Sequence, residues 1–336
     1  MKFGLLASAR FGEHDTADHV ESPRRNQALL EALASAALAV EQRPLRRATD
    51  DEILSLHHPS VLEKAEQTAA AGGGWLDPDT MVSPQSVEVA REGLGGAIDL
   101  ARAVAKGELD RGFACLRPPG HHATPRQSMG FCLFSNIALV ARACRDLAPR
   151  IFIFDWDVHH GNGTQDCLYE DPDTCFFSFH QSPFYPGTGA IEERGAGPGE
   201  GLNYNLPLPA GCADAEYLHA YDLMVSPAIR AYQPDLILVS AGYDAHGRDP
   251  LGGMRLTTEG FRQLAQRILH DSLAVPAQGK LVGLLEGGYN TAALAQSVVA
   301  TLEAWMGEPV EPDPPNRIHP QVLDFLETCR LRLTLS

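Results

Sequence analysis

The sequence predicts an α/β fold with a central parallel sheet and helices on both faces. Four short apolar runs have the length and composition of strands buried on both faces of such a sheet: residues 113–116, 151–154, 236–239 and 281–285. Candidate helices alternate with these runs along the 336 residues, and nothing between them resembles a linker. We therefore expect a single domain over residues 1–336.

Local signals mark several of the helices. Ser22-Pro23 is a typical helix start, because proline is tolerated in the first turn. The segment Thr49 to Glu52 has the pattern of a capping box. Ser83-Pro84 opens a third helix, expected to run to about Lys106, and a short terminal helix is expected near residues 322–331.

Composition argues against several classes of partner. The chain has 27 basic and 43 acidic residues, a net charge of −16, and no basic run that could follow a phosphate backbone, so we expect no nucleic-acid binding. An acidic surface attracts cationic substrates such as basic protein tails or polyamines, although it also serves solubility alone. The oligomeric state, a homo-oligomer included, stays open.

Cysteine usage and apolar stretches predict the compartment. The seven cysteines contain no CxxC pair, which predicts reduced thiols. The apolar part of the amino terminus is too short for a signal peptide, and no stretch approaches the ~18 apolar residues of a membrane helix. We expect a cytoplasmic protein without a membrane partner.

Each apolar run leads directly into residues that can bind metals or move protons. These motifs are RPPGHHA at 117–123, DWDVHHGNG at 155–163, SAGYDAH at 240–246 and EGGYN at 286–290. Because all strands of a parallel sheet point the same way, residues beyond their carboxyl ends gather at one edge. The four motifs are therefore expected to share one pocket.

Three residues of these motifs are candidate zinc ligands. Asp157 and His159 are separated by one residue, so at a strand end both side chains can point to the same side and chelate one ion. Asp244 adds a second carboxylate, and the three ligands leave coordination positions open, as catalytic zinc requires. A single Asp or His at a strand end is more commonly a cap, but here the residues occur together.

His121 and His122 are candidates for proton transfer. In a bent loop, both rings could line the place where a zinc-bound water would sit, one taking the proton while the other stays cationic. Asp155 and Asn162 flank the metal motif and are the expected partners of the two rings, with Asp favouring a cationic ring. The individual roles within the pair stay open.

Tyr289 follows two glycines that allow the backbone to bend. Its phenol could reach a metal-bound carbonyl and stabilise an oxyanion. Buried tyrosines usually only pack and hydrogen-bond, but the convergence of four motifs favours the catalytic role. The tandem His57-His58 lacks such neighbours and is interpreted as an ordinary surface or loop pair.

Taken together, these residues resemble the zinc-dependent histone deacetylase family, which also contains acetylpolyamine amidohydrolases and acetoin-utilisation proteins. The resemblance is to bacterial, class II-like members in particular. It runs from HVESPRR at 19–25 through the four motifs and also includes PGTG at 186–189 and DPLG at 249–252. Asn162 stands where class I members have Asp, and Glu286 begins a segment that is all glycine in class I.

The resemblance implies the arginase/deacetylase fold and assigns roles. It implies zinc ligands Asp157, His159 and Asp244, a general acid/base pair His121 and His122, and Tyr289 as the group that polarises the carbonyl. It also implies potassium, held at Asp155, Asp157, His159, Ser178 and Phe179, partly through backbone carbonyls. A second monovalent-cation site would fall on Leu168, Asp171 and Thr174.

The resemblance also places the acyl channel. Its aromatic walls correspond to Phe131, beside Gly130, and to Tyr185, which departs from the more usual Phe and adds a hydrogen-bonding group to the channel. Leu251 stands where a polyamine-preferring relative has a glutamate gatekeeper, which counts against strict polyamine specificity. The acceptor for the substrate N–H at the rim is Asp79 or Thr80.

The predicted activity is zinc-assisted hydrolysis of the amide bond of acetyl-lysine or a related acylated amine, with acetate and a free amine as products. An acetylpolyamine amidohydrolase is one alternative. An arginase-like ureohydrolase is another, but it needs further Asp ligands for a second metal, where this chain has His160 and Gly161. The third is a catalytically silent module that binds acyl-lysine.

Overall fold

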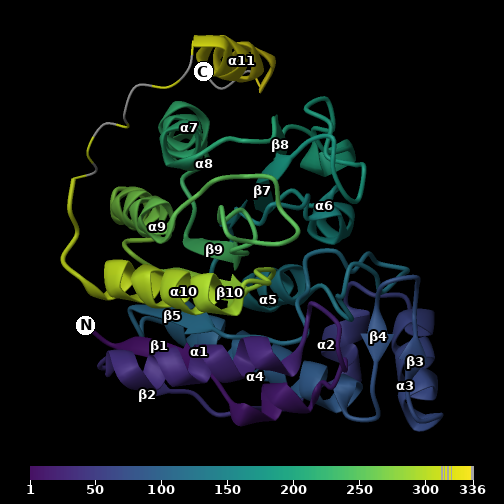
Figure 1. Ribbon diagram of the computed structural model, residues 1–336. Helices are drawn as coiled ribbons and strands as arrows, with labels where there is room; N and C mark the ends of the chain where they lie inside the picture. The colour runs from purple at the N-terminus through teal and green to yellow at the C-terminus, as the bar shows by residue number, and fades with distance from the viewer. Residues whose placement is uncertain (312, 314, 316–317, 319, 334–336) are drawn as a thin grey trace.

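A sheet of eight strands, each parallel to its neighbours, forms the centre of the structure (Figure 1). The computed structural model describes residues 1–333 except 312, 314, 316, 317 and 319. In the order of the sheet, the strands are β2 (Glu41–Gln42), β1 (Phe3–Leu6), β5 (Arg111–Ala114), β10 (Leu281–Leu285), β9 (Leu236–Ala241), β6 (Ile151–Asp155), β7 (Thr174–Gln181) and β8 (Asn203–Leu208). A separate antiparallel pair consists of β3 (Gly74–Trp75) and β4 (Met81–Val82).

Helices cover both faces, because the side chains of each strand alternate between two apolar cores. In β6, Phe152 and Phe154 face one core, and Ile151 and Ile153 face the other. The first core is covered by α1 (Pro23–Ala36), α7 (Asp214–Ala220), α8 (Ser226–Tyr232), α9 (Thr258–Leu273) and α10 (Thr291–Met306). The second is covered by α2 (Asp50–Leu54), α3 (Pro59–Ala70), α4 (Ser86–Ala105), α5 (Asn136–Cys144) and α6 (Asn162–Leu168). The predicted α/β class is confirmed.

The expected terminal helix is present as α11 (Pro320–Leu333). It packs Leu326, Cys329 and Leu333 into the first core and lies beside α7, at the top of Figure 1. Within the described part of the chain, no helix combines the length and apolarity needed to cross a membrane.

The four strands that lead into the polar motifs are neighbours at the centre of the sheet, in the order β5-β10-β9-β6. The expected strand 281–285 coincides with β10, and those at 151–154 and 236–239 are present as β6 and β9 with one and two further residues at their carboxyl ends. Because the strands are parallel, their carboxyl ends open on the same edge of the sheet. That edge is where the motifs meet.

The remaining expected strand, 113–116, is shifted by two residues, because β5 covers Arg111–Ala114. Apolar periodicity missed Arg111, a buried charged residue at the start of the strand. Its guanidinium donates hydrogen bonds to the backbone carbonyls of Gly279 and Trp305, which makes this burial tolerable.

The expected helix starts agree with the observed caps, with one shift. α1 begins at Pro23. The side chain of Thr49 accepts a hydrogen bond from the N–H of Glu52 at 3.1 Å and Glu52 accepts one from the N–H of Thr49 at 2.8 Å, so the capping box is confirmed. α4 begins at Ser86 rather than at Ser83, because Oγ of Ser86 accepts the N–H of Ser83 in a turn before the helix.

A buried charge cluster ties the amino-terminal part of the chain to the first motif. The carboxylate of Glu21 forms ion pairs with Arg25 at 2.9 Å and with Arg117 at 2.5 Å, and lies 3.4 Å from Nε2 of His14. Burial opposes the charge, but Arg117 and His14 hold the pKa of Glu21 well below its usual range. Because Arg117 is the first residue of the motif at 117–123, these ion pairs hold the start of that motif in place.

His57 supports the segment that follows the first motif. It is 2% exposed; Nε2 accepts the N–H of Ser135 at 2.9 Å, and Nδ1 lies 2.9 Å from the carbonyl oxygen of Thr124. The interpretation of His57-His58 as a surface or loop pair agrees with the structure: His58 is the exposed N-cap of α3, and His57 lies in the loop before α3, although it is buried. Because Nε2 accepts a backbone N–H, the ring is neutral.

Because His57 is neutral in the folded protein, we expect the stability of the protein to decrease in acid. Burial lowers the pKa of His57 from 6.5 to about 4. In the unfolded chain, His57 therefore binds a proton below pH 6.5, whereas in the folded protein it binds one only near pH 4. The free energy of unfolding consequently decreases as the pH falls through this window. We expect the free energy of unfolding to decrease by up to about 3 kcal/mol through this residue.

Denaturant unfolding at a series of pH values across this window measures the effect. His57→Asn should be less stable than the wild type at neutral pH and should lose less stability on acidification. The matched control is His58→Asn, which should follow the wild-type profile. Equal pH dependence of His57→Asn and the wild type would contradict the assignment.

Candidate active site

A cavity of about 380 Å³ lies at the edge of the sheet where the motifs meet. It is lined by Asp79, His122, Gly130, Phe131, His159, Phe184, Tyr185, Leu251 and Tyr289. The five residues predicted to contact a substrate therefore lie around one cavity with three of the predicted catalytic and metal-binding residues. Its walls are aromatic and its base carries imidazoles and a phenol, a composition suited to an apolar group with one polar end.

Three buried side chains at the base of the cavity could hold a metal ion: Asp157, His159 and Asp244. Nδ1 of His159 lies 3.0 Å from Oδ1 of Asp157 and 3.1 Å from Oδ2 of Asp244. The three ligand atoms lie within 4.8 Å of one another, and two carboxylates with one imidazole are a donor set that suits catalytic zinc. We call these residues the metal cluster; the part of the chain that the structure describes contains no other such group.

Backbone contacts hold both carboxylates of the metal cluster. The N–H of Gly287 donates to Oδ2 of Asp157 at 2.9 Å, and the N–H of Val158 donates to Oδ1 of Asp244 at 2.9 Å. A Cβ at position 287 would lie 2.7 Å from Oδ2 of Asp157 and would also overlap the carboxylate of Asp244. Only glycine allows the loop 286–290 to approach the cluster this closely.

The protonation of the metal cluster also fits a divalent cation. Burial and the charge of Asp157 raise the pKa of Asp244 to about 7. Burial opposes a charge on His159, but its hydrogen bonds to both carboxylates raise its pKa to about 10. A proton on His159 thus compensates the carboxylates, and a divalent cation on the same atoms would replace it.

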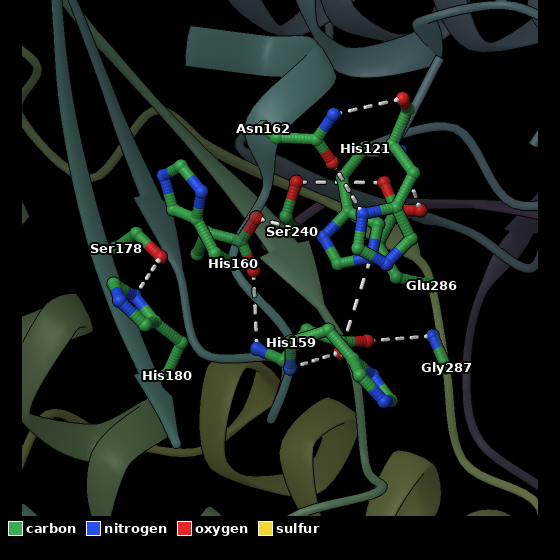
Figure 2. A network of polar contacts seen from close by, with 12 residues as sticks. His121, His159, His160, Asn162, Ser178, His180, Ser240, Glu286 and Gly287 are labelled. Atoms are coloured by element: carbon green, nitrogen blue, oxygen red, sulfur yellow. Dashed lines mark hydrogen bonds and ion pairs between the residues drawn. The ribbon is translucent and has the colours of Figure 1, made fainter. Parts of the chain in front are cut away.

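His121 and His122 lie with their ring centroids 4.0 Å apart and have different partners. Nδ1 of His121 lies 3.0 Å from Oδ2 of Asp155, and Nδ1 of His122 lies 2.7 Å from Oδ1 of Asn162 (Figure 2). The structure therefore brings each ring to one of the two partners expected from the sequence. A carboxylate favours a cationic ring, whereas an amide oxygen only fixes the tautomer.

These partners give the two rings opposite protonation states. Burial opposes a charge on His121, but Asp157, Asp155 and Glu286 raise its pKa well above the ordinary value. Burial, together with the positive charges of His121 and His159, lowers the pKa of His122 well below the ordinary value. His121 is therefore cationic. His122 is neutral, and because its Nδ1–H donates to Asn162, its Nε2 is the basic atom.

Tyr289 lines the cavity with a protonated phenol. Its N–H donates to Oδ2 of Asp249 at 2.6 Å, and the guanidinium of Arg25 lies 5.1 Å from the centre of its ring. Arg25 also donates to the carbonyl of Gly288 at 2.7 Å, so the backbone is held on both sides of the loop. Burial and the charge of Asp244 raise the pKa of Tyr289 well above its usual range. The hydroxyl is therefore a hydrogen-bond donor.

Phe131 and Tyr185 each pack edge-on against another residue that lines the cavity. The ring of Phe131 packs edge-on against Tyr289 with centroids 5.7 Å apart, and Tyr185 packs edge-on against His122 at 5.1 Å. Gly130 and Phe131 have φ values of 58° and 69°, an unusual pair for a segment that is not all glycine. A Cβ at Gly130 would overlap the ring of His122.

Asp79 and Thr80 hold this left-handed turn through its backbone. Oδ1 of Asp79 accepts the N–H of Gly130 at 3.2 Å, and Oγ1 of Thr80 accepts the N–H of Phe131 at 3.0 Å. The sequence did not decide whether Asp79 or Thr80 accepts the substrate N–H at the rim of the cavity. The structure places Asp79 in the cavity lining and buries Thr80 completely, so of the two only Asp79 can meet a ligand.

Of the residues expected to bind potassium, Asp155 ends β6 and Ser178 and Phe179 belong to the neighbouring β7, whereas Asp157 and His159 follow β6 in irregular structure. Asp155 of β6 is the register partner of Ser178 of β7, and Oγ of Ser178 lies 3.0 Å from Nδ1 of His180. The residues expected at a second cation site, Leu168, Asp171 and Thr174, lie between α6 and the start of β7. There the guanidinium of Arg145 forms an ion pair with Asp171.

Three residues at the site had no role assigned from the sequence. The ring of Phe184 stacks on His159 with centroids 5.1 Å apart and an interplanar angle of 17°. Asp249 holds the N–H of Leu251 at 3.0 Å in addition to that of Tyr289, and Arg25 lies beside the Tyr289 ring. The sequence offers weak signals, the HVESPRR segment that ends in Arg25 and an Asp before Pro-Leu-Gly. Neither signal identifies the partner.

His160 follows a metal-cluster residue but turns away from the cluster (Figure 2). Its Nδ1 lies 2.8 Å from Oγ1 of Thr188 and its Nε2 lies 3.2 Å from Oε1 of Gln165. Burial lowers the pKa of His160 to about 4, so the ring is neutral. Both ring nitrogens have protein partners, which disfavours His160 as the ligand of a second metal.

The sequence matches the histone deacetylase domain over residues 19–305. It is 42% identical to histone deacetylase 10, chloroplastic, of Oryza sativa, over 88% of this chain and 71% of the relative. It is 40% identical to a probable deacetylase of Methanothermobacter thermautotrophicus, over 92% of each chain. The crystal structure of the HDA15 HD domain matches with a TM-score of 0.88 at 32% identity, covering 98% of this chain and 96% of that one. With the geometry of its site, these matches show that the chain belongs to the histone deacetylase family.

Proposed function

We propose that this protein is a zinc-dependent deacylase that hydrolyses the amide bond of N-acetyl-lysine, or of a related acylated amine, to acetate and a free amine. One observation carries the proposal: His159 of the metal cluster, the neutral His122 and Tyr289 line one cavity with aromatic walls, and Asp157 and Asp244 lie directly beside His159. Membership of the histone deacetylase family supports the same reaction class.

Binding of the substrate would use the walls and the base of the cavity separately. Phe131 and Tyr185 would take the apolar stem of the acylated amine and keep water away from it. Asp157, His159 and Asp244 would hold the zinc ion, which when bound polarises the amide carbonyl and lowers the pKa of water.

Proton transfer follows from the different states of the two histidines. Nε2 of His122 takes a proton from the attacking water as the C–O bond forms, because this ring is neutral and its other nitrogen is fixed by Asn162. The cationic His121, held by Asp155, offsets the negative charge that develops. As the C–N bond breaks, the amine nitrogen takes the proton from His122.

Two residues bear on the choice between acetyl-lysine and acetylpolyamine. Leu251 at the cavity offers no charge to a second amine of a polyamine, and Tyr185 adds a hydroxyl to the wall. The net charge of −16 favours approach of a cationic peptide and of a polyamine alike, so the choice depends on these two residues. We therefore propose acylated lysine as the substrate, with acetylpolyamine amidohydrolase as the alternative.

A paired-substrate assay tests this function. Zinc-loaded protein is incubated with an acetyl-lysine peptide, an N-acetylated polyamine and longer acyl-lysine peptides, with and without a chelator, and the released acid is measured. Chelator-sensitive release from the peptide would support the proposal, and preference for the polyamine would favour the alternative. Binding without hydrolysis would indicate a silent module, and two metal ions per active chain would favour an arginase-like ureohydrolase.

Loss of a metal-cluster carboxylate should abolish zinc binding without unfolding the protein. We expect Asp244→Asn to weaken zinc binding by more than about 100-fold, because a neutral amide replaces one of two charged ligands. Competition with a zinc indicator measures the affinity, and the exposed Asp110→Asn is the control. Wild-type affinity in Asp244→Asn would rule out the cluster as the zinc site.

Removal of one hydroxyl tests the role of Tyr289. We expect Tyr289→Phe to keep its zinc and its melting temperature, while kcat falls by about 100- to 1,000-fold through loss of the donor to the oxyanion. The matched control is Tyr221→Phe, which removes a buried hydroxyl that donates to Asp271 instead. It should lower stability and leave kcat unchanged. Near-normal kcat in Tyr289→Phe would refute the oxyanion role.

A further inference from the structure

Glu286 is a fully buried acidic residue that helps to raise the pKa of His121 but contacts neither the substrate nor the metal in the proposed reaction. It follows β10 directly and precedes Gly287, yet it is absent from the cavity lining. Burying an ionisable group is costly unless its polar atoms find partners. The partners of Glu286 therefore indicate what the residue does.

The side chain of Glu286 binds the backbone of the histidine motif. Oε2 accepts the N–H of Gly120 at 2.7 Å and that of His121 at 3.1 Å, and Oε1 lies 3.4 Å from Oγ of Ser240 (Figure 2). Both backbone donors thus converge on a single oxygen. The carboxylate comes from β10 and the histidines follow β5, the adjacent strand, so this contact spans two motifs.

The backbone around the same residue binds the other half of the site. The carbonyl of Glu286 accepts a hydrogen bond from Arg25 at 2.5 Å, and the N–H of Gly287 donates to Asp157 at 2.9 Å. Arg25 in turn lies beside the ring of Tyr289. Glu286 is thus hydrogen-bonded to the histidine motif through its side chain and to Arg25 through its carbonyl, while the N–H of the next residue, Gly287, binds the metal cluster.

The histidine motif depends on such a contact because it has no regular structure. Residues 117–122 lie in neither a helix nor a strand, so no ladder satisfies the N–H groups of Gly120 and His121. Gly120 is also packed tightly, since a Cβ there would lie 2.6 Å from the backbone nitrogen of Asn136. Without an acceptor, two buried N–H groups would be unpaired, and the loop would have to move to satisfy them.

We propose that Glu286 is a positioning residue whose carboxyl oxygen fixes the backbone at Gly120 and His121 and thereby aims the rings of His121 and His122 at the metal cluster. The kinetic part of this inference rests on the proposed deacylase function, but the structural part does not. A displacement of about 1 Å of a catalytic group lowers the rate about 100-fold. We therefore expect kcat, rather than KM, to depend on Glu286.

Two substitutions separate the acceptor oxygen from the rest of the side chain. Glu286→Gln keeps one oxygen, which can accept both N–H groups while the new NH₂ faces Ser240. Burial raises the pKa of Glu286 to about 7, so a neutral side chain of this shape is tolerated. Glu286→Ala removes the acceptor. The matched control is Asp271→Ala, which deletes a carboxylate that is 2% exposed and accepts hydrogen bonds from Tyr221 and Ser226.

Kinetics and hydrogen exchange are measured on zinc-loaded full-length protein, with rates normalised to bound zinc. We expect Glu286→Ala to lose kcat by about 100-fold with KM within about threefold of the wild type, and Glu286→Gln to keep kcat within about tenfold. The amides of the peptide covering 117–123 should exchange faster in Glu286→Ala and close to the wild-type rate in Glu286→Gln. Asp271→Ala should lose stability and keep normalised kcat and exchange in 117–123.

Each other outcome counts against the positioning role. Near-normal kcat in Glu286→Ala, or a loss explained entirely by unfolded protein, would overturn it. Equal losses in the alanine and glutamine variants would overturn the hydrogen-bond basis, because the glutamine keeps the acceptor. If the wild type hydrolyses no acylated amine, the deacylase function fails, and unchanged exchange in 117–123 of Glu286→Ala would then separately refute the positioning role.

Discussion

Parallel pairing of the four central strands is the constraint on which the site depends. β5, β10, β9 and β6 are adjacent and point in the same direction, so four segments spread over some 170 positions of sequence end on one edge of the sheet. Each strand is buried on both faces and is therefore held rigidly. Irregular loops that follow rigid strands can place side chains far more accurately than loops of the same length elsewhere.

The buried charges around this edge are stable because each finds a partner from another motif. Asp155 binds His121, the metal-cluster carboxylates share His159, Glu21 binds two arginines, and Glu286 accepts two backbone N–H groups. An unpaired charge at any of these places would cost several kcal/mol. The polar contacts therefore join the motifs to one another as well as holding single residues. The same contacts set the two histidines to opposite protonation states, the arrangement on which the proposed proton transfer is based.

The cavity walls are held in place differently, mainly by hydrogen bonds to the backbone of loops. They come from the loops 130–131, 184–185 and 249–252. The first loop is fixed through backbone hydrogen bonds to Asp79 and Thr80, and the third through one to Asp249. The hydrogen bonds of the loops 130–131 and 249–252 involve the backbone and do not depend on the side chains there, whereas Phe184 stacks on His159 of the metal cluster. In the proposed function, the metal cluster and the histidines carry the reaction, and the walls, with Tyr185 and Leu251, would carry the substrate preference.

The sequence by itself determined the fold class, the four motif-bearing strands and the residues of the metal cluster, because strand periodicity, helix caps and metal-ligand chemistry are local in the chain. It also named Asp155 and Asn162 as partners of the histidine pair. Only the tertiary structure decided which partner each histidine has, that Asp79 rather than Thr80 faces the cavity, and that His57 is buried. It also showed Arg25, Asp249 and Glu286 converging on Tyr289 and the histidines. The physical reason is that a charged or polar residue does not encode its partner: the contact between Glu286 and Gly120 spans 166 positions and exists only because their strands are neighbours in the sheet.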